Sequence, residues 1–180
     1  MYKRQEIPEG KRRKVFTITK GTMASSAGID QSNGNGYYIL YPEDPFKSAR
    51  RLRAWLKKTY GIKSLGVLLT DSTSMPLRRG AVGCALAWDG FNPLKDYRKQ
   101  KDIFGRVFKA EVANIVDGLA SASVVVMGEG NEQIPVAVIR GANVSFTTKA
   151  KESVMVSPEE DIYAPFLLSR KWKKKPSVRE

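Results

Sequence analysis

SLGVLLTDS, residues 64–72, sets the expected architecture because a short apolar run ends there in an acidic residue. A run with β-branched residues that is bounded by polar ones is typical of a buried strand. Asp71 stands at the C-terminal end of this predicted strand, and ligands collect at that end of the strands in open α/β sheets. The segment therefore predicts both a sheet and a position for a functional side chain.

A helix is predicted directly before this strand. Asp44 suits the N-cap, Pro45 suits the first helical position, and Gly61 can close the helix. Its apolar face consists of Ala49, Leu52, Leu56 and Tyr60. YYILY, residues 37–41, is interpreted as a buried strand, so the strand–helix–strand order predicts a crossover unit.

The remaining elements are expected on both sides of this unit. KVFTITK, residues 14–20, alternates apolar and polar residues as a half-buried strand does, and a polar loop follows. Downstream we expect strands at 79–88 and 134–141, a long helix from about Gly105 to Met127, and a last helix opened by the capping-box spacing of Ser157 and Glu160. The fold class is therefore α/β (α+β), with helices and a mixed sheet.

Length and charge limit the possible classes of protein. The 180 residues suffice for one compact domain, which we place at 14–170, between a non-native or disordered basic leader at 1–13 and a disordered basic tail at 171–180. No apolar run approaches the roughly 18–20 residues of a membrane span, and no secretory signal is seen, so a cytoplasmic protein without a membrane partner is expected. Much of the net charge of +13 lies at the two ends, which disfavours nucleic acid as a partner.

The absence of histidine restricts the chemistry. It removes His-based zinc sites and the Ser-His-Asp triad, so any metal must be held by oxygen atoms. Oxygen-only sites favour hard cations such as Mg²⁺, Mn²⁺ or Ca²⁺. The single cysteine, Cys84, lies in an apolar run and is predicted to be a small buried hydrophobe.

Three acidic residues occupy positions that are typical of functional groups. Asp30 lies in a Gly/Ser/Asn loop, Asp71 ends the central strand, and Glu129 follows the long helix in a Gly-Glu-Gly loop. Each also has a structural interpretation, since Asp30 and Asp71 can make Asx turns or cap helices and Glu129 can be a solvated loop residue.

Five segments in order carry a resemblance to a known family. They are AGIDQSN, P-x-DP-x-x-SA, TDS-x-x-x-x-x-RRG, D-x-x-x-x-x-D-x-x-GR and MGEG-x-x-x-IPV-x-V-x-RG, at residues 27–33, 42–49, 70–80, 96–106 and 127–141. The series resembles the coenzyme F420-0:L-glutamate ligase (gamma-glutamyl ligase) family over about residues 27–144. The resemblance implies an unusual two-domain fold in an intertwined homodimer. It also implies an enzyme that uses GTP and divalent ions to add L-glutamate to a deazaflavin acceptor, coenzyme F420-0, through an acyl phosphate.

The same resemblance implies the site residues. It assigns a pair of Mg²⁺ or Mn²⁺ ions, with K⁺ as a further candidate, to Asp30, Asp71, Ser72 and Glu129. It assigns the nucleotide to Asn33 and to the loop of Met127, Gly128, Glu129, Gly130, Asn131, Glu132, Gln133 and Ile134, and it leaves the catalytic residues unknown.

Several other side chains have two interpretations. Arg78, Arg79, Arg106 and Arg140 can reach phosphate or cofactor, or else pair with surface acids. For the aromatic residues Trp55, Trp88 and Tyr97, core packing is preferred over stacking on a flavin-like ring.

Some positions depart from the family pattern. Ser74 and Met75 replace Gly-Arg, Asp117-Gly118 replaces Asp-Glu, and Lys99 and Gln133 replace glycines. A Ser/Lys-containing phosphate-binding segment of the family would precede this chain, which we expect to be N-terminally truncated. Two alternatives therefore stay open: a gamma-glutamyl ligase for a folate-like acceptor, and a non-catalytic relative that binds nucleotide or nucleic acid.

Overall fold

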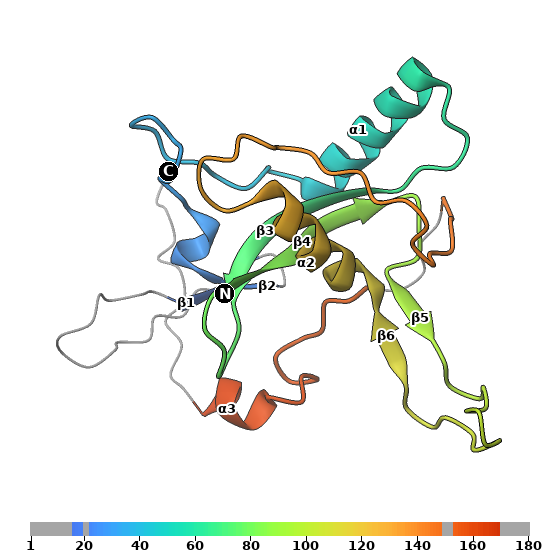
Figure 1. The fold of residues 1–180 in the computed structure, drawn as a ribbon. Helices are drawn as coiled ribbons and strands as arrows, with labels where there is room; N and C mark the ends of the chain where they lie inside the picture. The colour runs from blue at the N-terminus through green and yellow to red at the C-terminus, as the bar shows by residue number, and fades with distance from the viewer. Residues whose placement is uncertain (1–15, 20–21, 149–152, 170–180) are drawn as a thin grey trace. The chain divides into compact units, whose positions relative to one another are not determined.

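The computed structural model describes residues 16–19, 22–148 and 153–169. Contacts divide the chain into two units, one formed by Met1–Tyr41 with Met155–Glu180 and the other by Pro42–Val154. Figure 1 shows the helices and strands of both units, which together confirm the α/β class. The leader predicted at 1–13 and the tail predicted at 171–180 lie outside the described residues.

The first unit contains a small antiparallel ladder. β1 (Phe16–Thr19) pairs with β2 (Thr22–Ser25), which confirms the strand predicted at 14–20. The 3₁₀ turn η1 (Ser26–Gly28) follows, and two backbone hydrogen bonds of 2.8 and 3.1 Å between Asp30 and Ile39 close the next loop. The short helix α3 (Ala164–Leu168) also belongs to this unit.

The buried strand predicted at 37–41 is wrong. Tyr37 and Tyr38 are 76% and 66% exposed, and Ile39 makes only the isolated bridge to Asp30. The amide of Tyr37 donates to the carbonyl of Gly34, so this run belongs to a loop that closes on itself. The predicted crossover unit is wrong as well, because every ladder among the described strands is antiparallel.

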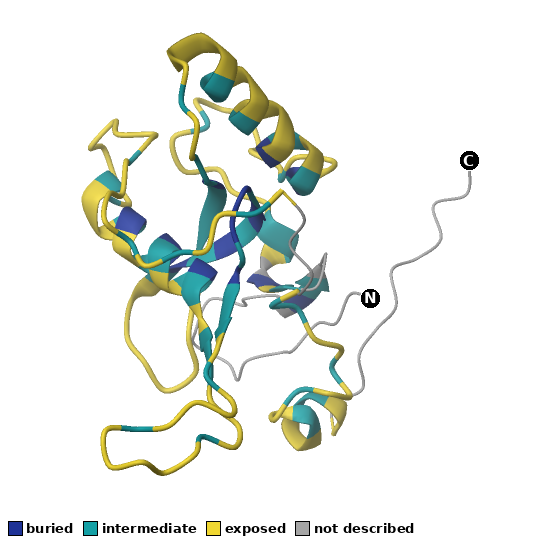
Figure 2. Ribbon diagram, turned by 90° about the vertical axis from the view of Figure 1, so that its right-hand side faces the viewer, coloured by how far each residue is buried: buried dark blue, intermediate teal, exposed yellow. Residues whose placement is uncertain are grey.

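The second unit begins with α1 (Pro45–Tyr60), which confirms the predicted helix at both ends. The carboxylate of Asp44 accepts the amide of Lys47 at 2.8 Å, and Gly61 adopts a left-handed conformation with φ of 65°. Figure 2 shows that most of α1 is exposed. Its fully buried Ala49 packs with Val67 and Ala87 in a small core.

β3 (Val67–Ser74) and β4 (Ala81–Asp89) form the central antiparallel ladder. Both predicted strands are confirmed, although β3 continues to Ser74 and Asp71 therefore lies inside the strand. Arg53 joins α1 to this ladder, since its Nε donates to the carbonyl of Leu65 at 2.7 Å and its Nη1 lies 3.1 Å from Asp89 Oδ2.

The long helix α2 (Ile115–Met127) ends where predicted but begins ten residues later than Gly105. Residues 94–114 instead form an arm in which β5 (Leu94–Asp96) pairs with β6 (Val112–Asn114). Asp102 shapes the end of this arm, because its carboxylate accepts the amides of Phe104 and Arg106, each at 2.9 Å. This turn chemistry prevails over the helical spacing of the apolar residues.

A bulge in β4 lets the two helices cover the ladder. Leu69 pairs with Ala87 and Thr70 pairs with Ala85, so Leu86 is an extra residue. A Cβ at Gly83 would meet the carbonyl of Ala120 in α2, whereas Ala87 packs with Ala49 in α1. Residues four apart in a regular strand share a face, so the bulge turns the second half of β4 toward the other helix.

Two predictions for the C-terminal third also need correction. The buried strand predicted at 134–141 is wrong, because these residues join no ladder among the described residues and Val136 and Val138 are 73% and 71% exposed. The last helix begins at Ala164, although the capping-box contact is present: the amide of Ser157 donates to Glu160 Oε2 at 3.3 Å. Among the described helices, none has the length and hydropathy needed to cross a membrane.

Candidate metal and nucleotide site

The carboxylate of Asp30 is oriented by its own loop. Oδ1 accepts the amides of Gln31 and Ser32 at 2.7 and 3.0 Å, and Oδ2 accepts the hydroxyl of Ser32. The hydroxyl and then the amide of Ser32 contribute most to a lowered pKa for Asp30, which keeps this exposed side chain ionised. An ionised, oriented carboxylate suits a hard cation, and the same geometry is an Asx turn, so both interpretations of Asp30 fit.

Asn33 belongs to the same loop. It is exposed and has a φ of 55°, in the left-handed region that asparagine tolerates better than most residues. At the start of the loop, Gly28 lies so close to the ring of Tyr41 that a Cβ would collide with it. The glycine of the AGIDQSN motif is therefore required for packing within the first unit.

Asp71 and Ser72 lie side by side in β3, opposite Cys84 and Gly83 respectively. Because Gly83 faces α2 and cross-strand partners share a face, Ser72 also faces α2. Successive side chains alternate in a strand, so Asp71 lies on the other face, the one that carries Val67 and Leu69. The carboxylate of Asp71 and the hydroxyl of Ser72 therefore lie on opposite faces of β3.

Cys84 is only partly buried, so the prediction of a buried thiol is met in part. Burial is the main reason that its pKa is raised to about 11, and the negative charges of Asp71 and Asp117 raise it further. The thiol is therefore protonated at neutral pH. Both carboxylates therefore lie near enough to Cys84 to raise the pKa of its thiol.

The predicted nucleotide loop follows α2. The amide of Gly128 donates to the carbonyl of Val124 at 2.8 Å, and the amide of Gly130 donates to Glu132 Oε2 at 2.8 Å. Glu132 lies against Gly128 at a position where a Cβ would collide, whereas Glu129 is exposed. The glycines let this loop fold tightly and expose its backbone.

The direction of α2 places this loop at one end of the ladder. Asp117 contacts Ala85, whereas Ser121 and Val124 lie at Gly83, so α2 runs along β4 toward Ala81. The turn at 75–80, which carries the exposed residues Arg78 and Arg79, joins β3 to β4 at this same end. The C-terminal end of α2, the end of β3 and the turn at 75–80 thus lie toward the same end of the ladder.

The predicted metal ligands are divided between the two units. Asp30 lies in the first unit, and Asp71, Ser72 and Glu129 lie in the second. Within the described ranges, no group of three or more Cys, Asp or Glu residues is arranged to hold a metal ion. The oxygen donors fit Mg²⁺ or Mn²⁺ by their chemistry, and their assembly around an ion stays a prediction.

The aromatic residues favour packing, as expected. Trp88 is buried, with its ring 5.0 Å from that of Phe46 in an edge-on contact, and Tyr97 packs on Phe108 with ring centroids 6.4 Å apart. Trp55 is the exception, because it is 54% exposed beside Tyr60.

Four arginines were predicted to pair with surface acids. Among the described residues, no ion pair of this kind is formed by Arg78, Arg79, Arg106 or Arg140.

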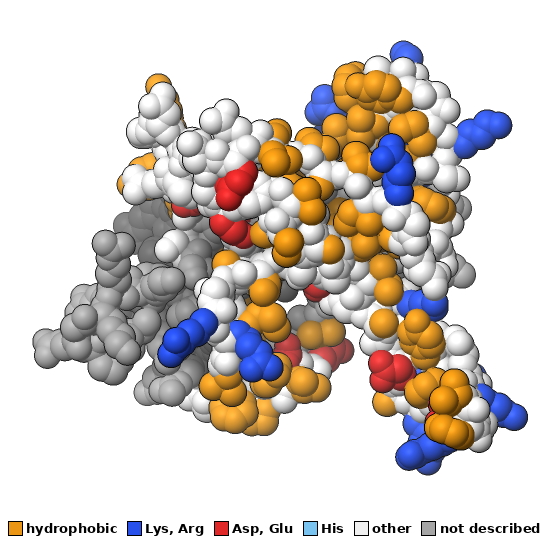
Figure 3. Space-filling model, in the orientation of Figure 1, with side chains coloured by type: hydrophobic (Ala, Val, Ile, Leu, Met, Phe, Trp, Pro, Cys, Tyr) orange, Lys and Arg blue, Asp and Glu red, His pale blue; other side chains and the backbone are white. Residues whose placement is uncertain are grey.

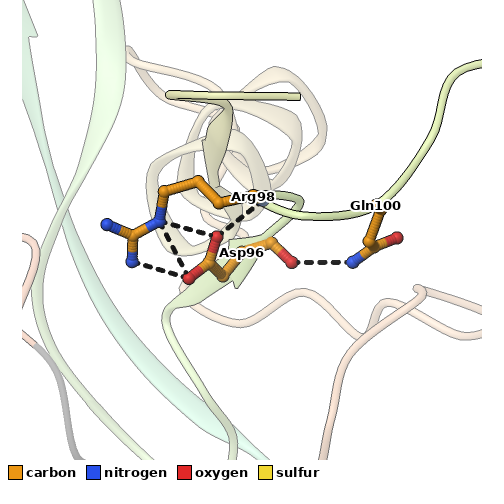
Figure 4. Close-up of polar contacts among 3 residues, drawn as sticks. All are labelled: Asp96, Arg98 and Gln100. Atoms are coloured by element: carbon orange, nitrogen blue, oxygen red, sulfur yellow. Dashed lines mark hydrogen bonds and ion pairs between the residues drawn. The ribbon is translucent and has the colours of Figure 1, made fainter. Parts of the chain in front are cut away.

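The arm carries a polar network of its own. Figure 4 shows Asp96 held by Arg98, whose Nη2 lies 2.6 Å from Oδ2, while Gln100 Nε2 donates to the carbonyl of Asp96 at 2.9 Å. The hydrogen bonds from Arg98 lower the pKa of Asp96 to about 2. Figure 3 shows Lys or Arg and hydrophobic side chains together at the exposed end of the arm.

One polar residue of the second unit was not predicted as functional. Asp117, in the first turn of α2, accepts the amide of Ala85 at 2.8 Å. Its spacing from Asn114 signals a helix cap in the sequence. No sequence signal identifies its partner in β4, 32 residues away.

The described residues thus combine oxygen donors with a glycine-rich loop after a helix in a mixed α/β fold. The chain belongs to the F420-0:Gamma-glutamyl ligase family, whose model matches residues 3–141. The family resemblance seen in the sequence is thereby confirmed, and the matched range contains every predicted site residue.

Curated relatives agree with this assignment. Proteins named "Coenzyme F420:L-glutamate ligase" include one from Methanocaldococcus jannaschii, 40% identical over 150 residues, which are 83% of this chain and 60% of the relative. Another from Archaeoglobus fulgidus is 38% identical over 143 residues, 79% of this chain and 57% of the relative. A third, from Haloarcula marismortui, is 36% identical over 161 residues, 88% of this chain and 61% of the relative. The chain thus spans about three-fifths of the length of these relatives.

Proposed function

We propose that this chain carries the metal- and nucleotide-binding part of a cytoplasmic ligase that uses GTP to add L-glutamate to coenzyme F420-0. One observation carries the proposal: the family match includes all of the predicted ligands, and relatives up to 40% identical are named for glutamate ligation. The mixed α/β unit, in which the glycine loop follows α2, supports it.

The proposed reaction has two steps. The acceptor carboxylate attacks the γ-phosphorus of GTP, the bond to the bridging oxygen breaks, and an acyl phosphate and GDP result. The amine of glutamate then attacks the acyl carbon, phosphate leaves with the C–O electron pair, and the nitrogen loses a proton as the amide forms. The protein has to position these groups and offset negative charge on the phosphate oxygens.

Named residues fit these tasks. Asp30, Asp71 and Glu129, with the hydroxyl of Ser72, would hold the divalent ions, which supply charge neutralisation at the triphosphate when bound. Asp30 is already ionised and oriented by Ser32. The amide of Gly130 now donates to Glu132, and a phosphate oxygen could take that place.

Homodimer formation is part of the proposal. Two apolar side chains at 134–139 are strongly exposed, Val136 at 73% and Val138 at 71%, and Ile134 and Ile139 are each 44% exposed. Patches of this kind are typical of interfaces, and a second copy of the chain would cover them. Light scattering coupled to gel filtration measures the mass directly.

The first experiment measures GTP binding by calorimetry with and without Mn²⁺. Wild-type chain should bind GTP only when Mn²⁺ is present, and Asp71→Asn should abolish that binding because the amide loses the ligand charge. Glu111→Gln makes the same chemical change at an exposed position outside the site and should bind normally. Metal-dependent GTP binding that survives in Asp71→Asn would refute the assignment of Asp71.

The second experiment measures product by mass spectrometry. GTP, glutamate and coenzyme F420-0 should yield GDP and an acceptor heavier by one glutamyl residue. A folate-type acceptor in a parallel reaction separates the two ligase alternatives. Glutamyl transfer to the folate alone would reject the deazaflavin acceptor.

A further inference from the structure

Asp117 uses both carboxylate oxygens inside the second unit. Oδ1 accepts the amide of Ala85 at 2.8 Å, and Oδ2 accepts the side-chain amide of Asn114 at 2.6 Å. The backbone amide of Asp117 in turn donates to Asn114 Oδ1 at 3.1 Å, which caps α2. The carboxylate therefore joins the start of α2 to β4.

The contact in β4 falls on the bulge. Ala85 is the partner of Thr70, the next pairing joins Ala87 to Leu69, and Leu86 between them is the extra residue. A bulge disrupts the ladder locally, and a buried amide without an acceptor is costly. Ala85 is 4% exposed, and its amide is satisfied by the carboxylate of Asp117.

The position of Asp71 depends on the same bulge. After the bulge, Asp71 pairs with Cys84 and Ser72 pairs with Gly83. A shift of this pairing by one residue would remove Gly83 from its contact with Ala120 and bring a larger side chain there. The register that places Asp71 is thus tied to the place where Asp117 contacts β4.

We propose that Asp117 is a positioning residue for Asp71, which it holds in place by fixing the β4 bulge from α2. This inference rests on the proposed function, in which Asp71 is a metal ligand. Asp117 itself touches neither ion nor nucleotide in this scheme, because both of its oxygens accept protein hydrogen bonds.

The test compares Asp117→Ala with Asn114→Ala. Both variants weaken the cap of α2, but only the first removes the acceptor for the amide of Ala85. Mn²⁺ is titrated in the presence of GTP and followed by electron paramagnetic resonance, while hydrogen exchange reports on the amide of Ala85 and thermal melting reports on the fold.

Asp117→Ala should weaken Mn²⁺ binding by about 10- to 100-fold, the usual effect of losing a partner that orients a metal ligand. Its Ala85 amide should exchange much faster. Asn114→Ala should lower the melting temperature as well, yet keep both Mn²⁺ affinity and Ala85 protection. Asp117→Asn keeps an acceptor oxygen and should recover most of the affinity.

The outcomes separate this inference from the proposed function. Wild-type Mn²⁺ affinity in Asp117→Ala, with binding lost in Asp71→Asn, overturns the positioning role and leaves the proposed function intact. An equal loss in Asn114→Ala also overturns it, because helix stability would then explain the effect. Normal affinity in Asp71→Asn refutes the proposed function itself.

Discussion

Gly83 illustrates how a single residue sets the packing of the second unit. A side chain there would meet the backbone of Ala120 and the side chain of Val124, so glycine lets α2 lie directly on β4. Gly118, which lies in α2 itself, has open space where its Cβ would be. The two positions therefore respond oppositely to an added methyl group.

Gly83→Ala should destabilise the fold by about 1–3 kcal/mol, because backbone has to move to admit the methyl group. Gly118→Ala is the matched control and should stabilise the fold by up to about 1 kcal/mol through helix propensity. Urea denaturation measures both free energies of unfolding. Equal stability of the two variants would contradict the close approach of α2 to β4.

Asp96 gives a prediction that depends on pH. Its pKa is lower in the folded chain, so its contribution to stability is present above the unfolded pKa and is lost as the pH falls through about 2. Arg98→Met removes the main cause and should raise the pKa of Asp96 toward its ordinary value. Carboxyl NMR titration measures this shift.

Lys99→Met is the control for Asp96, since Lys99 is the smallest of the contributors to its pKa. It should leave the titration of Asp96 nearly unchanged. A pKa that stays near 2 in Arg98→Met would show that Arg98 does not hold the carboxylate in solution.

Among the contacts between elements, Arg53 provides the polar link from α1 to the ladder. Its side chain and that of Asp89 are 15% and 19% exposed, and Arg53 also donates to the carbonyl of Leu65. Arg53→Met should cost about 1–3 kcal/mol, because it leaves a half-buried carboxylate and a carbonyl without this donor. Chemical denaturation measures the loss.

Asp89→Asn completes a double-mutant cycle for this link. If the ion pair contributes, the double variant should be more stable than the sum of the two single losses predicts. Purely additive losses would assign the effect of Arg53 to its bond with Leu65 alone.

Elements with local signals could be predicted from the sequence, and those that need a distant partner could not. The ends of α1 followed from Asp44 and Gly61, because caps are local chemistry. The start of α2 was missed because the Asp102 turn competes with a helical pattern. A strand at 134–141 needs a partner that the described residues do not supply.

The same distinction applies to the candidate site. Asp30, Asp71 and Glu129 could be selected because they occur in recognisable motifs within the family match. The contact of Asp117 with β4 could not be predicted, because it depends on an amide 32 residues away in the sequence. The pairing register and the bulge exist only in the folded ladder.

At the scale of the whole molecule, the net charge of +13 makes the chain repel itself. Added sodium chloride screens this repulsion and should raise the midpoint of thermal unfolding. The effect should shrink near pH 10, where lysines begin to lose their charge. An equal salt effect at both pH values would point to a cause other than self-repulsion.

The extra residue in β4 decides which face of the strand each later side chain occupies. If the bulge were lost and Leu86 joined a regular strand, Gly83 and Ala87 would lie on the same face, and only one of the two helices could pack on its present contact residue. The connection at 75–80 lacks this sensitivity, since its residues are exposed and an added residue there changes neither face. Relatives of this chain should therefore vary in length at that connection while keeping the residue count between Gly83 and Trp88 constant.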